Sequence, residues 1–164
     1  MDSNISFDPT KLSDTEKAFL KAKLDIHTYD EEDPDGCKVF KLKSRKKYTT
    51  KIGNNRKSVN YKVPQWCIGS TIRRHFGQKR RMFNPSAIAY SLEHGVVLYK
   101  KSDMDLSHLC GYTLCLNPDH LTQESHSYNL SRRTCHASRG IPWVCRHVPQ
   151  CIIKTVDIKN KQVF

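Results

Sequence analysis

The chain has 164 residues and a mass of 19.0 kDa, and 28 Lys and Arg residues against 16 Asp and Glu residues give it a net charge of +12. This length fits one domain of ordinary size. Only seven glycines and seven prolines are present, which excludes collagen-like and low-complexity chains. The sequence has no apolar stretch of the roughly 18 residues that a membrane-spanning helix needs, and its first residues lack the basic and apolar regions of a secretory signal.

The charge is unevenly distributed along the chain. Residues 1–35 contain ten acidic residues and four lysines, a net charge of −6, whereas residues 36–164 contain 24 basic and six acidic residues, a net charge of +18. So basic a segment favours a polyanionic partner, most simply nucleic acid, over an anionic membrane surface, since no basic amphipathic helix stands out. We therefore divide the chain into an acidic N-terminal helical segment, residues 1–35, and a basic domain, residues 36–164.

The first predicted element is a helix over about residues 14–26. Ser13 and Glu16 have the spacing of a capping box, and apolar residues at helical spacing follow them. The acidic run that comes next, residues 30–35, is closed by Gly36 and indicates a solvated loop.

A strongly basic segment with strand periodicity follows. Residues 38–62 contain ten Lys or Arg residues and no acidic one, and a predicted turn at Gly53-Asn54-Asn55 makes residues 38–63 a β-ribbon. Taking the alternation of each strand by itself, we expect one mostly apolar face and one polar, basic face that contains Lys47, Thr49, Lys51, Arg56, Ser58, Asn60 and Lys62. A two-stranded ribbon fits the major groove of DNA. The alternative is a solvated sheet face that binds nothing.

Three shorter elements are predicted beyond the ribbon. Apolar residues four apart between 68 and 76 predict a short helix that carries Arg73 and Arg74 outward, either as phosphate contacts or as part of a solvated face. A second helix is predicted over residues 84–93, because Asn-Pro precedes it and glycine follows it. A short buried strand is predicted over residues 96–99.

Seven cysteines without an export signal indicate a reducing compartment, where clustered Cys and His residues are metal ligands rather than disulfides. Three of these ligands have the spacing C-x4-C-x4-H, and a closed tetrahedral zinc site needs a fourth. The residues alone leave Cys37 and Cys67 open for that place. The later segment contains a complete set of four. The two sets are Cys110, Cys115 and His120, and then Cys135, Cys145, His147 and Cys151.

Both clusters together, with His108 two residues before the first cysteine and Asn129 nine residues after His120, form a much sharper pattern. It resembles the His-Cys box homing endonucleases of the I-Ppo type, which belong to the ββα-metal, or His-Me finger, nucleases. The resemblance is strongest over residues 107–151. It implies an α+β fold, a small mixed domain of short antiparallel sheets and helices with two structural zinc sites and a ββα-metal active site.

The resemblance also implies roles for individual residues. His108 matches the general base, Asn129 the asparagine that holds the catalytic Mg²⁺, and Arg56, directly after the predicted turn, the arginine that contacts the scissile phosphate. Cys37 matches the fourth ligand of the first zinc, which leaves Cys67 as a free thiol. The family acts as a homodimer on a long, nearly palindromic site in double-stranded DNA, and we expect the same of this chain, with an intracellular, nuclear location.

The chemistry of phosphodiester hydrolysis agrees with these roles. A neutral imidazole, with a pKa of about 6.5, can take a proton from the attacking water. A Mg²⁺ ion held by one amide oxygen and by DNA oxygens can neutralise the leaving 3′ oxygen. We expect Thr122 to cap the helix that carries Asn129, and His126, one turn before Asn129, to be a surface residue.

Two other functions stay open. One is a zinc-stabilised, sequence-specific DNA-binding protein without cleavage, and the other is a non-specific nuclease of the same ββα-metal group. The presence of both His108 and Asn129 favours the enzyme over the first alternative. The Thr, Ser and Asn residues of the ribbon favour base reading over phosphate binding alone, and so a site-specific enzyme.

Overall fold

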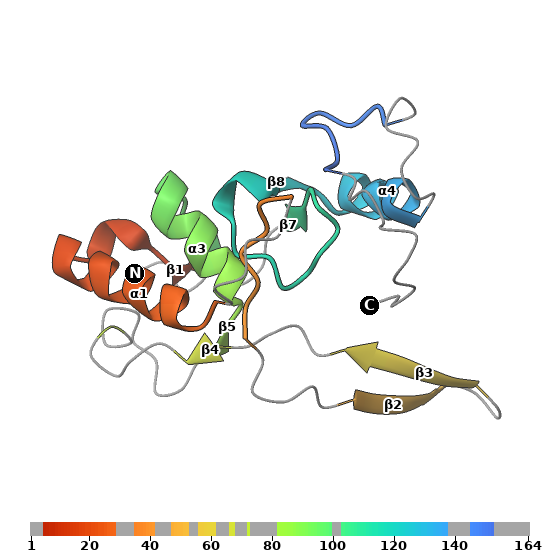
Figure 1. Cartoon of the computed structure of the whole chain (residues 1–164), viewed down its shortest axis with the longest axis horizontal. Coiled ribbons are helices and arrows are strands. Elements are labelled where there is room, and N and C mark those ends of the chain that lie inside the picture. The colour runs from red at the N-terminus through yellow and green to blue at the C-terminus, as the bar shows by residue number, and fades with distance from the viewer. Residues whose placement is uncertain are drawn as a thin grey trace.

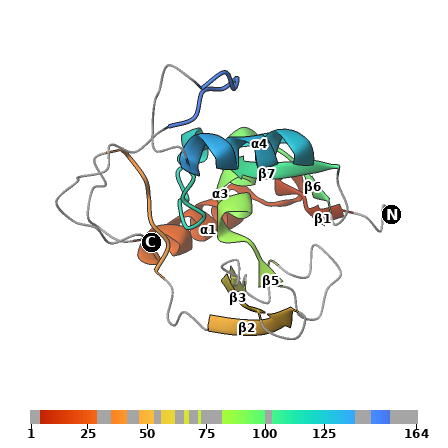
Figure 2. The same cartoon turned by 90° about the vertical axis from the view of Figure 1, so that its right-hand side faces the viewer.

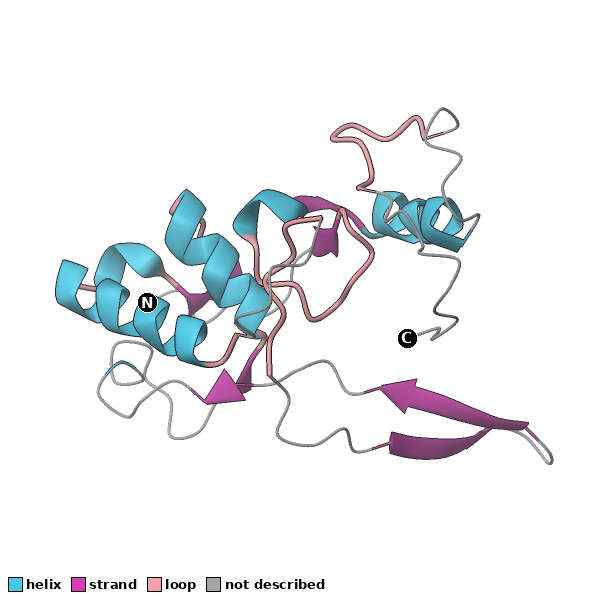
Figure 3. Ribbon diagram, viewed as in Figure 1, coloured by secondary structure: helices cyan, strands magenta, loops and turns pink. Residues whose placement is uncertain are grey.

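The computed structural model describes residues 5–28, 35–41, 47–52, 56–61, 66–67, 72, 82–99, 103–137 and 145–152. Within these ranges the fold is α+β, as predicted: three α-helices accompany short strands that pair two by two in antiparallel sheets (Figures 1 and 3). None of the helices in this part of the chain is long and apolar enough to cross a membrane.

Helix α1, Asp14–Ile26, begins at the predicted capping box. The Ser13 hydroxyl accepts a hydrogen bond from the Glu16 backbone N–H at 3.2 Å, and a Glu16 carboxylate oxygen accepts one from the Ser13 backbone N–H at 2.9 Å. These bonds satisfy N–H groups that the first turn of a helix leaves without partners, which is why the chain turns helical here. The helix follows strand β1, Ile5–Phe7, and the short 3₁₀ turn η1, Pro9–Lys11.

Helix α3, Pro85–His94, confirms the second predicted helix and packs against α1. The side chain of Asn84 caps its first turn, and Gly95, at a φ of 69°, ends it in the left-handed conformation that favours glycine. Between the two helices, Lys21 Nζ lies 3.0 Å from a carboxylate oxygen of Glu93.

The main apolar core joins the acidic N-terminal segment to the basic part of the chain. Its buried side chains come from both sides of residue 35 and are Phe7, Leu12, Leu20, Leu24, Phe40, Trp66, Ile72, Phe83, Ile88, Leu92 and Leu116. Although the division of the chain at residue 35 stays a prediction, the N-terminal helix contributes to the same core as α3.

Two small sheets border this core. Strand β4, Trp66–Cys67, pairs with β5, Met82–Phe83, and β1 pairs with β6, Leu98–Tyr99. The prediction of a buried strand over 96–99 is wrong in its extent and its burial, since only two residues pair and the Tyr99 side chain is 50% exposed. The reason is the size of the sheet: among the described residues, β6 pairs with β1 and with no other strand.

The predicted ribbon is present as β2, Lys47–Ile52, paired with β3, Arg56–Tyr61, and it stands apart from the helices in Figures 1 and 2. The prediction of one shared polar face is wrong. Thr49 pairs with Val59 and Thr50 pairs with Ser58, and directly opposed residues share a face. Thr49 and Ser58 therefore belong to opposite faces.

The cause of this difference is the length of the turn. Three residues, 53–55, separate the paired residues Ile52 and Arg56, so odd-numbered residues pair with odd-numbered ones and even with even. The predicted face combined odd residues of the first strand with even residues of the second, which requires a turn with an even number of residues. Each face of the ribbon thus carries a mixture of polar and apolar residues.

The C-terminal half contains a ββα unit. Strands β7, Met104–His108, and β8, Leu121–Ser125, pair antiparallel, with a long loop and the 3₁₀ turn η2, Pro118–His120, between them. Helix α4, His126–Ala137, follows β8 directly and packs on β7 (Figure 2). This unit places one end of a strand, a loop of metal-binding residues and one face of a helix close together.

The prediction that Thr122 caps this helix is wrong. Thr122 lies inside β8, opposite Ser107, because the strand pairing continues to residue 125. The first turn is capped instead by Ser125, whose hydroxyl accepts a hydrogen bond from the Tyr128 backbone N–H at 3.3 Å.

Candidate metal centres and active site

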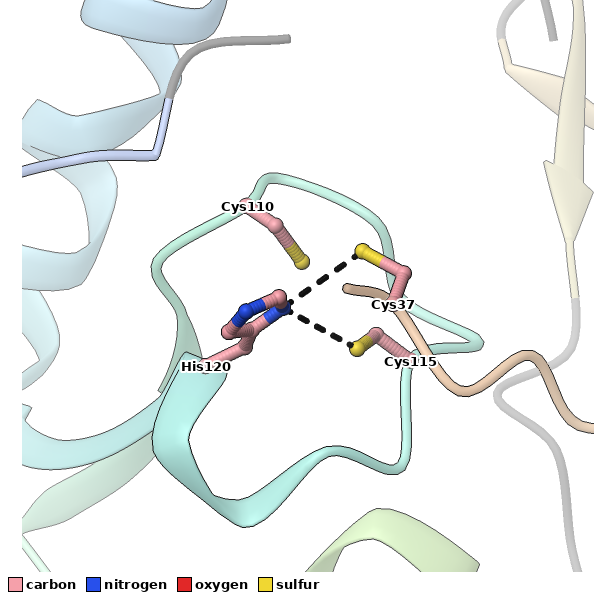
Figure 4. Close-up of side chains that lie close together, drawn as sticks. All are labelled: Cys37, Cys110, Cys115 and His120. Carbon is pink, nitrogen blue, oxygen red and sulfur yellow. Dashed lines mark hydrogen bonds between the residues drawn. The ribbon is translucent and has the colours of Figure 1, made fainter. Parts of the chain in front are cut away.

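The first predicted ligand set comes together in the loop between β7 and β8 (Figure 4). The ligand atoms of Cys37, Cys110, Cys115 and His120 lie within 4.8 Å of one another, and all four residues are buried. His120 Nδ1 lies 3.5 Å from Cys37 Sγ and 3.6 Å from Cys115 Sγ. A tetrahedral zinc with bonds of about 2.3 Å to sulfur and 2.0 Å to nitrogen separates these atoms by about 3.5 Å. The donor set therefore fits zinc.

Cys37 reaches this loop because its segment runs beside it in an antiparallel bridge. Phe40 N donates to Leu114 O at 2.9 Å and Leu116 N donates to Lys38 O at 2.6 Å, with Cys37 just before them in the chain. The Asn117 side chain donates to Gly36 O at 2.8 Å from the other end of the segment. The sequence left open whether Cys37 or Cys67 completes the first ligand set. Backbone pairing places Cys37 in the cluster.

The protons of this cluster are shared between neighbouring thiols. The pKa of Cys115 falls to about 5 because the Cys110 thiol donates a hydrogen bond to it, and the same bond raises the pKa of Cys110. Buried thiols grouped in this way do not all ionise by themselves. A divalent cation supplies the positive charge that lets every ligand bind as a thiolate.

The second set, Cys135, Cys145, His147 and Cys151, also has its ligand atoms within 4.8 Å of one another. The three sulfur atoms lie 3.3, 3.4 and 3.5 Å from His147 Nδ1, again close to the spacing around a tetrahedral zinc. The other ring nitrogen of His147 lies 2.7 Å from the hydroxyl of Ser131 on α4, which fixes the orientation of the ring.

A buried arginine connects the second cluster to the ββα unit. Arg132, on α4, donates hydrogen bonds to both carboxylate oxygens of Glu124 on β8. Its Nη1 donates to Pro149 O at 2.8 Å and to Cys151 Sγ at 3.3 Å. A hydrogen bond to a metal-binding thiolate from a fixed cation stabilises the negative charge on sulfur.

His108 lies at the end of β7, directly before the first metal loop. Burial lowers its pKa to about 4, and a hydrogen bond to the backbone of Cys115 holds the ring. Its Nε2 is buried and has no hydrogen-bond partner among the described residues. The imidazole is therefore neutral over the physiological pH range and has one nitrogen left for a further group.

Asn129, on α4, lies beside the strand residue that precedes His108. The Ser107 hydroxyl donates to Asn129 Oδ1 at 2.8 Å, and Asn129 Nδ2 donates to an oxygen of Asp105 at 2.9 Å. His126 Nδ1 lies 2.7 Å from the same Asp105 oxygen. The hydrogen bonds from Asn129 and His126 lower the pKa of Asp105.

The comparisons with known proteins agree with this geometry. The family model for the zinc-binding loop region of homing endonucleases matches residues 28–163, which is most of the chain. The chain belongs to this family. Comparison with curated proteins and with solved structures finds no match. Because this family is zinc-binding, the two Cys/His clusters could each bind zinc, and membership indicates a nuclease that acts on DNA.

Sequence reasoning missed Asp105 in this homing endonuclease domain, and it described His126 only as a surface residue. A usable signal was present, because Asp105 and Ser107 alternate on one face of a strand and His126 and Asn129 are one turn apart on a helix. His126 is indeed 71% exposed, yet it is bonded to Asp105.

His136 is a second residue for which the sequence indicated no partner. It lies near the end of α4, and its ring forms a hydrogen bond with the backbone of His108. The ring also packs against Gly111, which has a φ of +66° and no room for a Cβ atom, since one would lie 2.7 Å from His136 Cγ. Contacts of His136 with His108 and Gly111 thus hold helix α4 against the first metal loop, next to the candidate base His108.

For several predicted site residues, the structure describes only the backbone or nothing at all. Arg56 begins β3, but its side chain and those of the other ribbon residues are outside the described part, as is the side chain of Cys67 in β4. Lys62, Arg73 and Arg74 lie outside the described ranges altogether. Their roles stay predictions.

Proposed function

We propose that the protein is a site-specific endonuclease of the homing type, which hydrolyses phosphodiesters of double-stranded DNA with His108 as general base and one Mg²⁺ per active site. The observation that carries this proposal is the position of two residues on the ββα unit. Ser107, adjacent to His108, is hydrogen-bonded to Asn129, so the candidate base and the candidate metal ligand come from neighbouring elements.

His108 has the properties that a general base requires. Burial keeps the ring neutral, and the hydrogen bond with the Cys115 backbone fixes its orientation. Nε2 is buried and has no hydrogen-bond partner among the described residues, so it would take the proton once the attacking water enters beside it. A positioned general base accelerates a reaction by roughly 10²–10⁴-fold. The first zinc cluster would serve by shaping the loop that supplies the Cys115 backbone.

Asn129 would hold the Mg²⁺ ion. An amide oxygen is a hard ligand of the kind that Mg²⁺ prefers, and Asn129 Oδ1 uses one of its two lone pairs on the Ser107 hydroxyl. When bound, the ion neutralises charge on the leaving 3′ oxygen. Arg56, on the ribbon, would contact the scissile phosphate.

DNA binding would involve the ribbon and the basic surface. Residues 36–164 carry a net charge of +18, which attracts a polyanion, and a paired ribbon fits the major groove. The protein would act in the nucleus as a homodimer of the His-Cys box, I-Ppo type, on a near-palindromic site. The residues proposed to contact DNA are those of one ribbon face, either Lys47, Thr49 and Lys51 or Ser58 and Asn60, together with Lys62, Arg73 and Arg74.

The test is cleavage of a randomised duplex library by the zinc-loaded protein with Mg²⁺, alongside DNA binding. His108→Ala should lose roughly 10²–10⁴-fold in cleavage rate and keep its DNA affinity, because the base acts on water. His94→Ala, which removes an exposed histidine on α3, is the matched control. Unchanged cleavage by His108→Ala at neutral pH would disprove the assignment.

The same library distinguishes the proposed function from the two alternatives, a non-specific nuclease and a DNA-binding protein without cleavage. A site-specific enzyme cuts a small set of related sequences, whereas a non-specific nuclease cuts throughout the library. A protein that only binds DNA enriches sequences without cutting them.

A further inference from the structure

The side-chain amide of Asn129 can adopt two orientations, related by exchange of its oxygen and nitrogen. An ionised carboxylate only accepts hydrogen bonds, so the amide nitrogen has to face Asp105. The Ser107 hydroxyl on the other side can donate, and it does so to Oδ1 at 2.8 Å. Asp105 therefore decides which atom of Asn129 lies on the Ser107 side.

We propose that Asp105 is a positioning residue for the catalytic divalent ion: it turns the Asn129 amide so that oxygen, not nitrogen, is presented as the metal ligand. This inference rests on the proposed function, because it assigns Asn129 as the ligand. An amide turned the other way would present N–H groups, which cannot bind a cation.

The surroundings of Asp105 are built to keep it in place as an acceptor. It projects from β7, whose backbone is paired with β8 along its length, and His126 Nδ1 lies 2.7 Å from the same carboxylate oxygen that accepts from Asn129. An aspartate side chain with its ordinary pKa of about 3.9 is ionised at neutral pH, so Asp105 can only accept hydrogen bonds. Strand and helix thus converge on one carboxylate oxygen.

A role in stability alone does not explain this arrangement. The side chains of Asp105 and His126 are 34% and 71% exposed, and a polar contact between side chains this exposed contributes little to folding. Loss of Asp105 should consequently change the affinity for the divalent ion while leaving zinc content and thermal unfolding unchanged.

The test is a Mn²⁺ titration of the zinc-loaded, ¹⁵N-labelled protein followed by NMR. Paramagnetic broadening of the Ser107 and His108 backbone amide signals reports ion binding without any cleavage. Mn²⁺ binds more weakly than zinc to Cys and His ligands, so the two clusters keep their metal. Asp105→Asn should raise the Mn²⁺ concentration at half-broadening by about 10–100-fold, as loss of a residue that orients a metal ligand usually does.

Asp103→Asn is the matched control, since it removes the same charge from an exposed position two residues away and should leave the midpoint unchanged. A second variant, Asp105→Asn with Asn129→Asp, keeps the net charge and reverses the hydrogen bond, so that residue 129 again offers an oxygen. Its midpoint should return toward that of the natural protein. An unchanged midpoint in Asp105→Asn, or no recovery in the double variant, would overturn the inference.

Asn129→Ala distinguishes a failure of this inference from a failure of the proposed function. If Asn129→Ala loses the broadening while Asp105→Asn keeps it, the ion binds at Asn129 and only the role of Asp105 is wrong. If the signals of Asn129→Ala also broaden at the original midpoint, the ion is bound elsewhere. In that case both the proposed metal site and the role of Asp105 are wrong.

Discussion

Arg132 and Glu124 form a bidentate ion pair inside the protein, with Nε–Oε1 at 2.8 Å and Nη2–Oε2 at 2.9 Å. Their side chains are 1% and 8% exposed. Because Arg132 also donates to Cys151 Sγ and to Pro149 O, a single side chain connects β8, α4 and the second metal cluster.

Replacement of Arg132 by methionine should therefore destabilise the zinc-loaded protein by about 3–5 kcal/mol, the usual effect of leaving one buried charge without its partner. Zinc should also be lost faster to a chelator, since Cys151 loses its donor. Arg133→Met, on the exposed side of the same helix, is the control and should change neither property. Equal denaturation midpoints for the two variants would show that the pair is energetically unimportant.

Two zinc ions should be found per chain by elemental analysis. Cys37→Ser should remove the zinc of the first cluster and Cys135→Ser that of the second, because each leaves a site with three ligands. Cys67→Ser is the matched control and should leave both ions in place. One zinc per natural chain, or loss of zinc in Cys67→Ser, would contradict the ligand sets.

Gly111→Ala should destabilise the protein more than Gly95→Ala. Both glycines have a φ near +70°, where a side chain costs about 1–2 kcal/mol. Only at Gly111 does the new Cβ also meet a neighbour, the His136 ring, whereas nothing lies within 4 Å of it at Gly95. The difference between the two urea denaturation midpoints measures the clash, and adding His136→Ala should reduce that difference. Equal effects of the two substitutions would mean that His136 moves aside freely.

The ribbon should contact DNA bases with one of its two faces. The register of β2 and β3 defines which residues belong to each face. Lys47, Thr49 and Lys51 share one face, and Thr50, Ser58 and Asn60 share the other. Alanine substitutions in the face that enters the groove should change base preference, by about 1–3 kcal/mol for each lost bidentate contact. Substitutions in the other face should leave the preferred site unchanged. Selection from a randomised library with each variant measures this, and altered preference from both faces would exclude a ribbon lying flat in one groove.

Features encoded by neighbouring residues could be predicted from the sequence. Helix α1 follows from its capping box, α3 from the Asn-Pro that opens it and the glycine that ends it, and the two metal sets from cysteine and histidine spacing. In each case the physical cause lies within a few residues of the element that it explains. Spacing alone did not identify the fourth ligand of the first metal set, since Cys37 comes from a distant segment.

What the sequence did not reveal depends on contacts between distant segments. The relation between the ribbon faces depends on the number of turn residues, and the limit of β8 depends on pairing with β7, which is why Thr122 was misplaced. The contacts of Asp105 with Asn129 and of His136 with Gly111 exist only after α4 packs on β7. Alternation along one element cannot show which residue of another element lies opposite.

The two clusters differ in how much of the chain they close, and this has a consequence for protein synthesis. The second cluster draws all of its ligands from residues 135–151, so it is complete within one short stretch. The first joins Cys37 to ligands that begin at residue 110, across the helices and strands of the main core. A nascent chain therefore exposes the Cys37 thiol long before its partner ligands leave the ribosome. That thiol is exposed to premature metal capture or oxidation until residue 120 has left the ribosome.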